Sequence, residues 1–449
     1  MSFKITSELL EKITSHIDAS NNKAIITLFK EMHYADIAEI IEEISFENSI
    51  YLIKLLDSEK TSSILTELDE ELREKILQNL SAKEIAEEVE ELDSDDAADI
   101  IGELSESLQE AVMSQIEDEE HVKEIEELLR YSENSAGGLM AKELVKVNEN
   151  WTVLKCVREM RAQAENVTRV HSIYVVDDQN KLKGRLSLKD LLIASTKTSI
   201  SDVYIPKVDY VNVKDDLDEV SIKMRKYDLE AIPVVDDNRF LLGRITIDDM
   251  VDVIKEEADK DYQLAAGLTK DVEADDSIAQ LTKARLPWLF LGLIGGVGAF
   301  LIMGLFESSF SENTVLFFFT PLIAAMAGNV GVQSSAIIVQ GLANDDVKGS
   351  INSRLVKELF LATLNGFVLA IFLFLFVWYY EEKVDTAIAI SVSLVAVIIV
   401  AGLIGTFVPL FLNKRGLDPA IATGPFITTS NDIFGILIYF MIAKGILGI

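Results

Sequence analysis

Long apolar runs fill the last third of the chain and restrict what it can fold into. Five of them, at about 286–306, 314–342, 358–380, 386–412 and 419–447, are long enough to cross a bilayer, which takes about 20 helical residues. Backbone polar groups inside a bilayer must pair within their own segment, so these runs should be helices. The sequence therefore predicts a membrane domain of five transmembrane helices at 286–449.

Charge is divided unevenly along the chain. Residues 281–449 hold nine Lys or Arg and ten Asp or Glu, so 32 basic and 64 acidic side chains of the totals of 41 and 74 lie in the first 280 residues. This excess argues against nucleic acid or anionic lipid heads as partners and favours cations. No Cys or His cluster has zinc spacing, and there is no activated nucleophile or phosphate-cradling Gly loop, so we do not expect an enzyme.

Basic residues orient the membrane domain, because they concentrate on the cytoplasmic flanks of membrane helices. We expect a multi-pass protein of the cell membrane with its N-terminus and acidic part in the cytoplasm and its C-terminus outside. The outer flanks carry only Lys383 and Lys444. The expected cytoplasmic flanks carry Lys283, Arg285, Lys348, Arg354, Lys357, Lys414 and Arg415.

A twelve-residue repeat runs from Met32 to Ile116. An apolar residue recurs at every twelfth position, and an apolar pair follows eight and nine residues later except at Glu88/Val89. Each unit predicts a short helix and a turn, and stacked units must form a solenoid because none can bury its apolar side alone. We therefore expect an α-helical superhelical domain at 1–136. Expected helix caps are Asp57, Asp69, Ser81, Asp93 and Ser105.

A second repeat has an offset of 59 residues and aligns 171–190 on 230–249 without gaps. Each copy reads as a strand, a turn, a short strand after Gly184 or Gly243, and a helix, with an amphipathic helix ahead near 153–164 or 217–227. This resembles a tandem pair of α/β cystathionine-β-synthase (CBS) domains, which we place at 137–196 and 197–258. The resemblance implies that the turns after Gly184 and Gly243 bind a nucleotide such as ATP. The alternative is that the same residues only cap the helices that follow. The residues concerned are Ser187, Asp190, Thr246 and Asp249.

The membrane domain carries polar groups at bilayer depth. Asp432 lies well inside the last apolar run, where an ionised carboxylate costs a few kcal/mol and should face a partner, a cavity or an ion path. The second run, weakened by Pro321, brings Gly328 and Asn329 to mid-membrane, which suits either close helix packing or a wet pore. An acidic helix and a further helical stretch lead into the membrane, and we expect a continuous helical connection at 259–285. This connection either transmits movement of the acidic part to the membrane domain or only tethers the two.

In this order, the parts resemble the MgtE family of magnesium channels. The motifs that carry the resemblance are D-S-D-D-A-A-D (93–99), Y-S-E-N-S-A-G-G-L-M (131–140), A-R-L-P-W-L at the membrane entry, G-N-V-G-V-Q-S and S-N-D. The resemblance implies a homodimer whose ion path follows its two-fold axis, with Asp432, Gly328 and Asn329 around a hydrated Mg²⁺. It also implies a cytosolic Mg²⁺ sensor. The sensor residues would be Asp95, Asp99, Asp216, Asp218, Asp228, Asp249, Glu257, Asp261 and Asp418.

These features predict a Mg²⁺-selective channel that imports magnesium and is closed by cytosolic Mg²⁺. An alternative is a Na⁺- or H⁺-coupled divalent cation carrier that protonates Asp432, and another is a membrane-anchored nucleotide sensor. Three departures from the family pattern concern ion selectivity and sensor affinity: Val330 and Val332 in the pore stretch, Gly424 where the family often has Asn, and Lys260 in the acidic linker.

Overall fold

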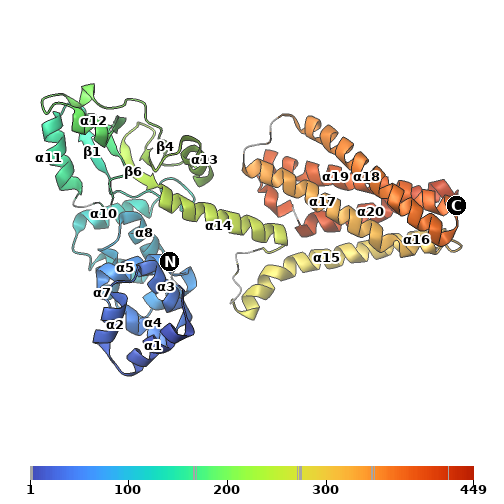
Figure 1. Cartoon of the computed structure of the whole chain (residues 1–449), viewed down its shortest axis with the longest axis horizontal. Coiled ribbons are helices and arrows are strands. Elements are labelled where there is room, and N and C mark those ends of the chain that lie inside the picture. Colours follow the sequence, from blue (N-terminus) through green and yellow to red (C-terminus); the bar gives the residue numbers. More distant parts are fainter. Residues whose placement is uncertain are drawn as a thin grey trace. The chain divides into compact units, whose positions relative to one another are not determined.

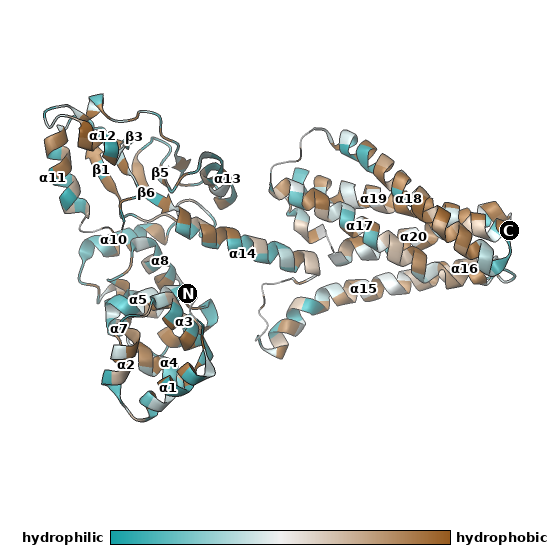
Figure 2. Cartoon of the chain, in the orientation of Figure 1, coloured by the Kyte–Doolittle hydropathy of each residue, from teal (hydrophilic) through white to brown (hydrophobic). Residues whose placement is uncertain are grey.

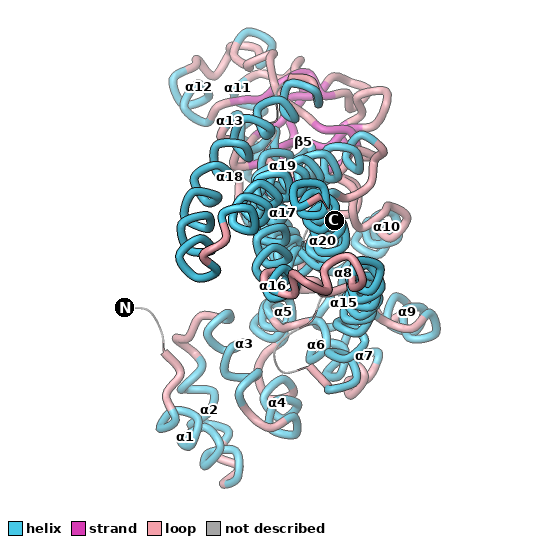
Figure 3. Tube along the Cα trace, turned by 90° about the vertical axis from the view of Figure 1, so that its right-hand side faces the viewer, coloured by secondary structure: helices cyan, strands magenta, loops and turns pink. Residues whose placement is uncertain are grey.

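The computed structural model describes residues 4–164, 167, 169–269, 272, 276–344, 347, 349–422 and 424–448. The chain forms two compact units, Met1–Ile254 and Lys255–Ile449 (Figure 1). Figure 3 shows the strands grouped with the helices α11 (Val153–Gln163), α12 (Leu188–Ile193) and α13 (Leu217–Tyr227). Lys348, one of the basic residues used to orient the membrane domain, lies outside the described residues.

Short helices build the N-terminal part of the first unit, as the twelve-residue repeat predicts. The apolar pairs of the repeat lie in its core, among them Ile40/Ile41, Ile64/Leu65 and Ile76/Leu77. Stacking of neighbouring units therefore buries what one unit cannot. The helices are α1 (Ser7–Asp18), α2 (Asn22–Phe29), α3 (Tyr34–Glu43), α4 (Phe46–Ile53), α5 (Ser58–Glu67), α6 (Glu70–Leu77), α7 (Ala82–Val89), α8 (Ser94–Glu103), α9 (Glu106–Met113) and α10 (Glu119–Leu128).

Three of the five expected side-chain caps form. Asp57, Asp69 and Ser81 each accept a backbone N–H of the helix that follows, and Ser81 forms a capping box with Glu84. The Asp93 and Ser105 side chains stand at N-cap positions without such a bond, so this part of the prediction is wrong. For Asp93 the reason is visible, because its carboxylate lies 3.4 Å from Arg244 Nη2 instead.

Glu88, which breaks the apolar pattern, is buried at that core position. Its side-chain oxygen accepts the hydroxyl of Thr61 from α5, and only 8% of the residue is exposed. Burial raises the pKa of Glu88 to about 7. A hydrogen bond between neighbouring units thus replaces an apolar contact in the solenoid.

The two CBS domains repeat one small fold. In each, a first strand runs parallel to a second, which pairs antiparallel with a third. The strands are β1 (Val145–Asn148), β2 (Ile173–Val176) and β3 (Leu182–Leu186), then β4 (Val211–Asn212), β5 (Ala231–Val235) and β6 (Leu241–Thr246). The helices are α11 (Val153–Gln163), α12 (Leu188–Ile193) and α13 (Leu217–Tyr227), with a short 3₁₀ turn η2 (Ile200–Asp202).

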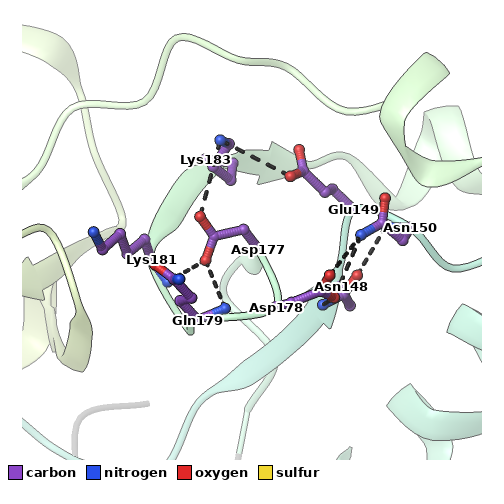
Figure 4. Close-up of polar contacts among 8 residues, drawn as sticks. All are labelled: Asn148, Glu149, Asn150, Asp177, Asp178, Gln179, Lys181 and Lys183. Carbon is purple, nitrogen blue, oxygen red and sulfur yellow. Dashed lines mark hydrogen bonds and ion pairs between the residues drawn. The ribbon is translucent and has the colours of Figure 1, made fainter.

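A turn between the second and third strands shows the duplication at the level of hydrogen bonds. In the first copy, one carboxylate oxygen of Asp177 accepts from the backbone of Gln179 and Lys181 (Figure 4). In the second copy, Asp236 accepts from Asn238 and Phe240 in the same way. The third strands begin two residues before Gly184 and Gly243 rather than after them. The reason is that the turns end at Lys181 and Phe240, where the last of these hydrogen bonds is made.

Five long apolar helices form most of the second unit, as predicted, and Figure 2 shows their hydrophobic residues in brown. Pro321 does not weaken the second one but stands in its first turn, where its missing N–H costs nothing. Small residues bring helices together, since Gly405 packs on the backbone of Gly331. The helices are α15 (Ile278–Phe306), α16 (Val315–Phe318), α17 (Thr320–Ala343), α18 (Ile351–Glu381), α19 (Val384–Lys414) and α20 (Gly424–Leu447), with η3 (Pro419–Ala422).

The connection into the membrane is not one continuous helix. Helix α14 (Ile247–Ala266) ends where Gly267 takes a φ of +87°, a left-handed conformation that favours glycine at a helix C-terminus. Helix α15 begins at Ile278, after a capping box made by Ser277 and Gln280. The expectation of an unbroken helical connector is therefore wrong, because glycine ends the first helix.

Candidate ion path and acidic cluster

The predicted pore residues lie where α17 and α20 pack together. A Cβ added to Gly328 would lie 3.9 Å from the Asp432 Oδ1 atom, an ordinary contact distance, and 3.2 Å from Thr428 Cγ2, so the bare glycine face makes room for the Thr428 methyl group and lies beside the carboxylate. Asp432 itself is half-buried, whereas Asn329 is exposed in the single chain. The structure thus brings Asp432 to Gly328 and places Asn329 on an outer face of α17. We call the α17–α20 contact around Asp432 the candidate ion path.

Asn431, next to Asp432, fastens the two helices of the candidate ion path. Its Nδ2 atom donates to the Ala327 carbonyl at 3.3 Å and occupies the space beside Gly331 where a Cβ would stand. The residue is 1% exposed, and its Oδ1 atom has no hydrogen-bond partner among the described residues. The amide therefore positions α20 on α17.

Glu358 is a second carboxylate in an apolar helix and is not among the predicted site residues. It extends from α18 to accept the Ser334 hydroxyl of α17 at 2.7 Å. A Cβ on Gly402 of α19 would lie 2.7 Å from its Oε1 atom, so glycine makes the room for it. The described residues give this carboxylate no ion pair. Its place at the first position of an apolar run, two turns into α18, is the signal that could have found it.

Helix α14, which we call the linker helix, ends against the start of α20 within the second unit. The Ala265 carbonyl oxygen occupies the place where Gly424 would carry a Cβ, and Pro425 packs on Gly267 in the same manner. Gly424 has a φ of +39°, and any side chain there would collide with the Ala265 carbonyl, so glycine at this position has a structural role. Asp418, just before η3, accepts the Ala420 N–H at 2.7 Å.

An acidic cluster lies in the first unit, where the start of α8 meets the segment before β1. Asp93, Asp95 and Glu143 each offer an oxygen, and these atoms lie within 4.8 Å of one another. Glu143 replaces Asp93 as the cap of α8: its two oxygens accept the backbone N–H and the hydroxyl of Ser94 at 3.0 and 2.9 Å. We call Asp93, Asp95 and Glu143 the acidic cluster. Only Asp95 was predicted, because a contact across 49 residues has no periodic signal.

Electrostatics make the acidic cluster costly without a cation. Desolvation is the largest cause of the raised pKa of Asp95, Asp96 and Asp99, and the carboxylate of Asp249 raises all three further. Asp95 Oδ1 is buried without a hydrogen-bond partner among the described residues. The structure therefore brings the predicted Asp95, Asp99 and Asp249 to one region, where divalent cations would relieve repulsion.

The other predicted sensor residues lie elsewhere. Asp216 caps α13 by accepting the N–H of Asp218 at 3.1 Å. Asp228 ends α13 with a left-handed backbone. Glu257 and Asp261 lie on α14 beyond the first unit, and both have interactions of their own. None of the five belongs to the acidic cluster as the described residues define it.

A cavity of about 490 Å³ lies between the two CBS domains. None of the four residues predicted for a nucleotide lines it: Thr246 donates to Asp249 across the start of α14, and Ser187 stands at the N-cap of α12, which also holds Asp190. The lining was missed because it joins the two copies of the repeat. It consists of His171, Ser172, Tyr174, Arg185, Lys207, Val208, Asp209, Tyr227, Asp228, Leu229, Glu230, Ala231 and Pro233.

Comparison with known proteins agrees with this architecture. Sequence profiles match for the MgtE family described as divalent cation transporters (320–442), the MgtE intracellular N domain (32–134) and the CBS domain (136–197 and 200–256). Magnesium transporters MgtE of Enterococcus faecalis and Thermus thermophilus are each 36% identical, over 71% of this chain and 70% and 71% of their own lengths.

A solved structure resembles the part of the chain before the membrane helices. It is the cytosolic domain of the Mg²⁺ channel MgtE in complex with ATP, with a TM-score of 0.52 and 32% identity over 54% of this chain and 99% of that one. Sequence, domain order and fold thus agree over most of the length. The chain belongs to the MgtE family of magnesium transporters.

Proposed function

We propose that this protein is a Mg²⁺ channel whose conduction depends on Asp432. The family is one of magnesium transporters and not of enzymes. The observation that carries the proposal is the approach of Asp432 to the bare face of Gly328 inside a unit of five apolar helices. Mg²⁺ gives up its water reluctantly, so a carboxylate with nearby backbone oxygens suits a hydrated ion better than a dry cage does.

Magnesium flux into proteoliposomes tests this role. Asp432→Asn keeps the size of the side chain and removes its charge, and we expect it to abolish Mg²⁺ uptake. Asp385→Asn is the matched control, because Asp385 is an exposed carboxylate in the first turn of α19. Normal uptake by Asp432→Asn would refute the role of Asp432.

A homodimer completes this proposal, with the ion path on its two-fold axis. Asn329 is exposed in the single chain although it lies next to Gly328, and this position suits a face that a second copy covers. Two symmetry-related Asp432 side chains would then hold one hydrated ion. The mass of the purified protein in detergent tests this assembly, and a monomer that transports normally would refute it.

Cytosolic Mg²⁺ closes the proposed channel through the acidic cluster. Two carboxylates 4 Å apart repel each other by roughly 4 kcal/mol at an effective dielectric of about 20, and a divalent cation removes this repulsion. The contact of Ala265 and Gly267 with Gly424 and Pro425 joins the linker helix to the pore helix, so a shift of α14 reaches α20 directly. Asp95→Asn with Asp249→Asn should leave the channel active at high Mg²⁺, and unchanged closure would refute the sensor.

We retain the other sensor residues and the predicted organisation as part of this proposal. The domain limits are 1–136, 137–196, 197–258, 259–285 and 286–449, with the acidic part in the cytoplasm and the C-terminus outside. Cysteine labelling of a substituted C-terminal residue in intact cells tests the orientation. Labelling only after the membrane is opened would contradict it.

A nucleotide is the proposed ligand of the cavity between the CBS domains, because a relative's cytosolic domain was solved in complex with ATP. Arg185 and Lys207 offer positive charge for phosphates, and Tyr227 offers a face for a base. ATP titration of the full chain tests this, with Lys207→Ala expected to weaken binding and Lys197→Ala as control. Equal affinities would point to the Ser187 and Thr246 turns instead.

Glu358 favours a second candidate function, a proton-coupled carrier. It is a membrane carboxylate that accepts a hydrogen bond from Ser334 and has no ion pair among the described residues, so it offers a second proton-binding group besides Asp432. A carrier predicts Mg²⁺ uptake driven by a pH gradient and lost in Glu358→Gln but not in Glu381→Gln at the end of the same helix. Mg²⁺ uptake that does not depend on the pH gradient would exclude the proton-coupled carrier.

A further inference from the structure

A second group of metal-ligating side chains adjoins the acidic cluster. One imidazole nitrogen of His121 and one oxygen each of Glu124 and Glu143 lie within 4.8 Å of one another. His121 and Glu124 are three residues apart on α10 and so share a helix face. Glu143 belongs to both groups, which places the second group directly beside the first.

The Val89 carbonyl fixes the tautomer of a neutral His121 imidazole. Its Nε2 atom lies 3.2 Å from the Val89 carbonyl oxygen, which can only accept, so Nε2 carries the proton. Neutral imidazole then has its lone pair on Nδ1. Metal-ligating histidines commonly donate the other ring N–H to a backbone carbonyl in this way.

Glu143 is fixed in place without using up its oxygens. Each oxygen accepts one hydrogen bond from Ser94, the first residue of α8, and a carboxylate oxygen has a second lone pair. The carboxylate can therefore cap a helix and serve two neighbouring cations. A hydrogen-bonded ligand of this kind loses little freedom when it binds a metal.

The group has excess negative charge. Glu124 and Glu143 are both carboxylates, and the carboxylate of Glu120 adds to the negative potential at Glu124. Lys142 acts in the opposite direction, but its ammonium group lies 2.7 Å from a Glu127 oxygen. A bound cation would supply the missing positive charge.

We propose that His121, Glu124 and Glu143 bind a divalent transition-metal ion of the Mn²⁺, Co²⁺ or Zn²⁺ class. A nitrogen ligand distinguishes this group from the all-oxygen acidic cluster, since Mg²⁺ prefers oxygen and imidazole suits transition metals. The inference extends the sensing role proposed above: the cytosolic part would respond to a second class of metal. Its test is metal binding rather than transport, so either proposal can fail alone.

Pulsed EPR of Mn²⁺ on the full-length protein in detergent tests the site, with excess Mg²⁺ present to fill oxygen-only sites. We expect ¹⁴N modulation from a coordinated imidazole. His121→Gln should remove the modulation and weaken Mn²⁺ binding at least tenfold, while Glu124→Gln should weaken binding and keep the modulation. His16→Gln, at the end of α1, is the control and should change neither.

Two results would overturn the proposal. One is a wild-type spectrum without nitrogen modulation, and the other is modulation that persists in His121→Gln. Circular dichroism of each variant shows whether it folds, and the wild-type spectrum decides the question even if a variant does not. Mg²⁺-dependent closure that remains normal in His121→Gln would separate this site from the acidic cluster.

Discussion

Gly424→Ala should uncouple the linker helix from the pore helix. A Cβ at this position would collide with the Ala265 carbonyl oxygen and lie 3.3 Å from its carbon. Both sides of this contact are backbone, so neither can turn away as a flexible side chain would. The helices must separate, and the contact between Gly267 and Pro425 would loosen with them.

The size of the effect follows from these contacts. A left-handed backbone costs an alanine about 1 kcal/mol, and the collision adds to this. If the contact belongs to the closed state, a loss of about 1–2 kcal/mol shifts the closed–open equilibrium roughly 5- to 30-fold toward open. The cytosolic Mg²⁺ concentration for half-closure should therefore rise about tenfold.

Patch recordings with stepwise changes in cytosolic Mg²⁺ measure this shift. Gly416→Ala is the matched control, because Gly416 also has a positive φ, +70°, but nothing lies within 4 Å of its would-be Cβ. Gly424→Asn should behave like Gly424→Ala, since Asn tolerates the backbone but not the collision. Closure of Gly424→Ala at the wild-type Mg²⁺ concentration, or an equal shift in Gly416→Ala, would refute the reasoning.

Three further predictions concern single contacts. Arg244→Met should destabilise the folded protein by about 3 kcal/mol in thermal unfolding, because the buried guanidinium group donates to the Glu143 carbonyl and pairs with the half-buried Asp93, whereas exposed Arg239→Met should have little effect. Glu88→Gln should remove a loss of stability that develops as pH rises from about 4.5 to about 7. The native pKa of about 7 exceeds the ordinary 4.5, so the native state holds the proton more tightly, and denaturant unfolding at pH 8 should show a gain of about 3 kcal/mol. Gly331→Ala should separate α17 from Asn431 and reduce Mg²⁺ flux, but Gly292→Ala, with nothing within 4 Å, should not; equal fluxes would contradict the packing role.

Features with a local period could be predicted from the sequence. The solenoid, the duplicated CBS fold and the five membrane helices all follow from apolar residues at regular spacing. Asp432 could be found because an ionised carboxylate inside an apolar run is energetically costly and therefore indicates a functional or structural partner. Strands β1 and β4, with four and two residues, are too short for a periodic signal.

Features that depend on long-range contacts could not be predicted. Glu143 joins Ser94 across 49 residues, and the cavity is lined by both CBS copies. Gly424 looked like a departure from the family, and only its contact with Ala265 gives it a role. Sequence alone shows which residues are unusual, whereas the fold shows which of them meet.

Single-channel recording tests the central claim most directly. The purified protein in a planar bilayer, with Mg²⁺ as the only permeant cation, should show unitary currents that Asp385→Asn retains and Asp432→Asn loses. Unitary Mg²⁺ currents of wild-type size in Asp432→Asn would contradict the assignment of Asp432 to the ion path.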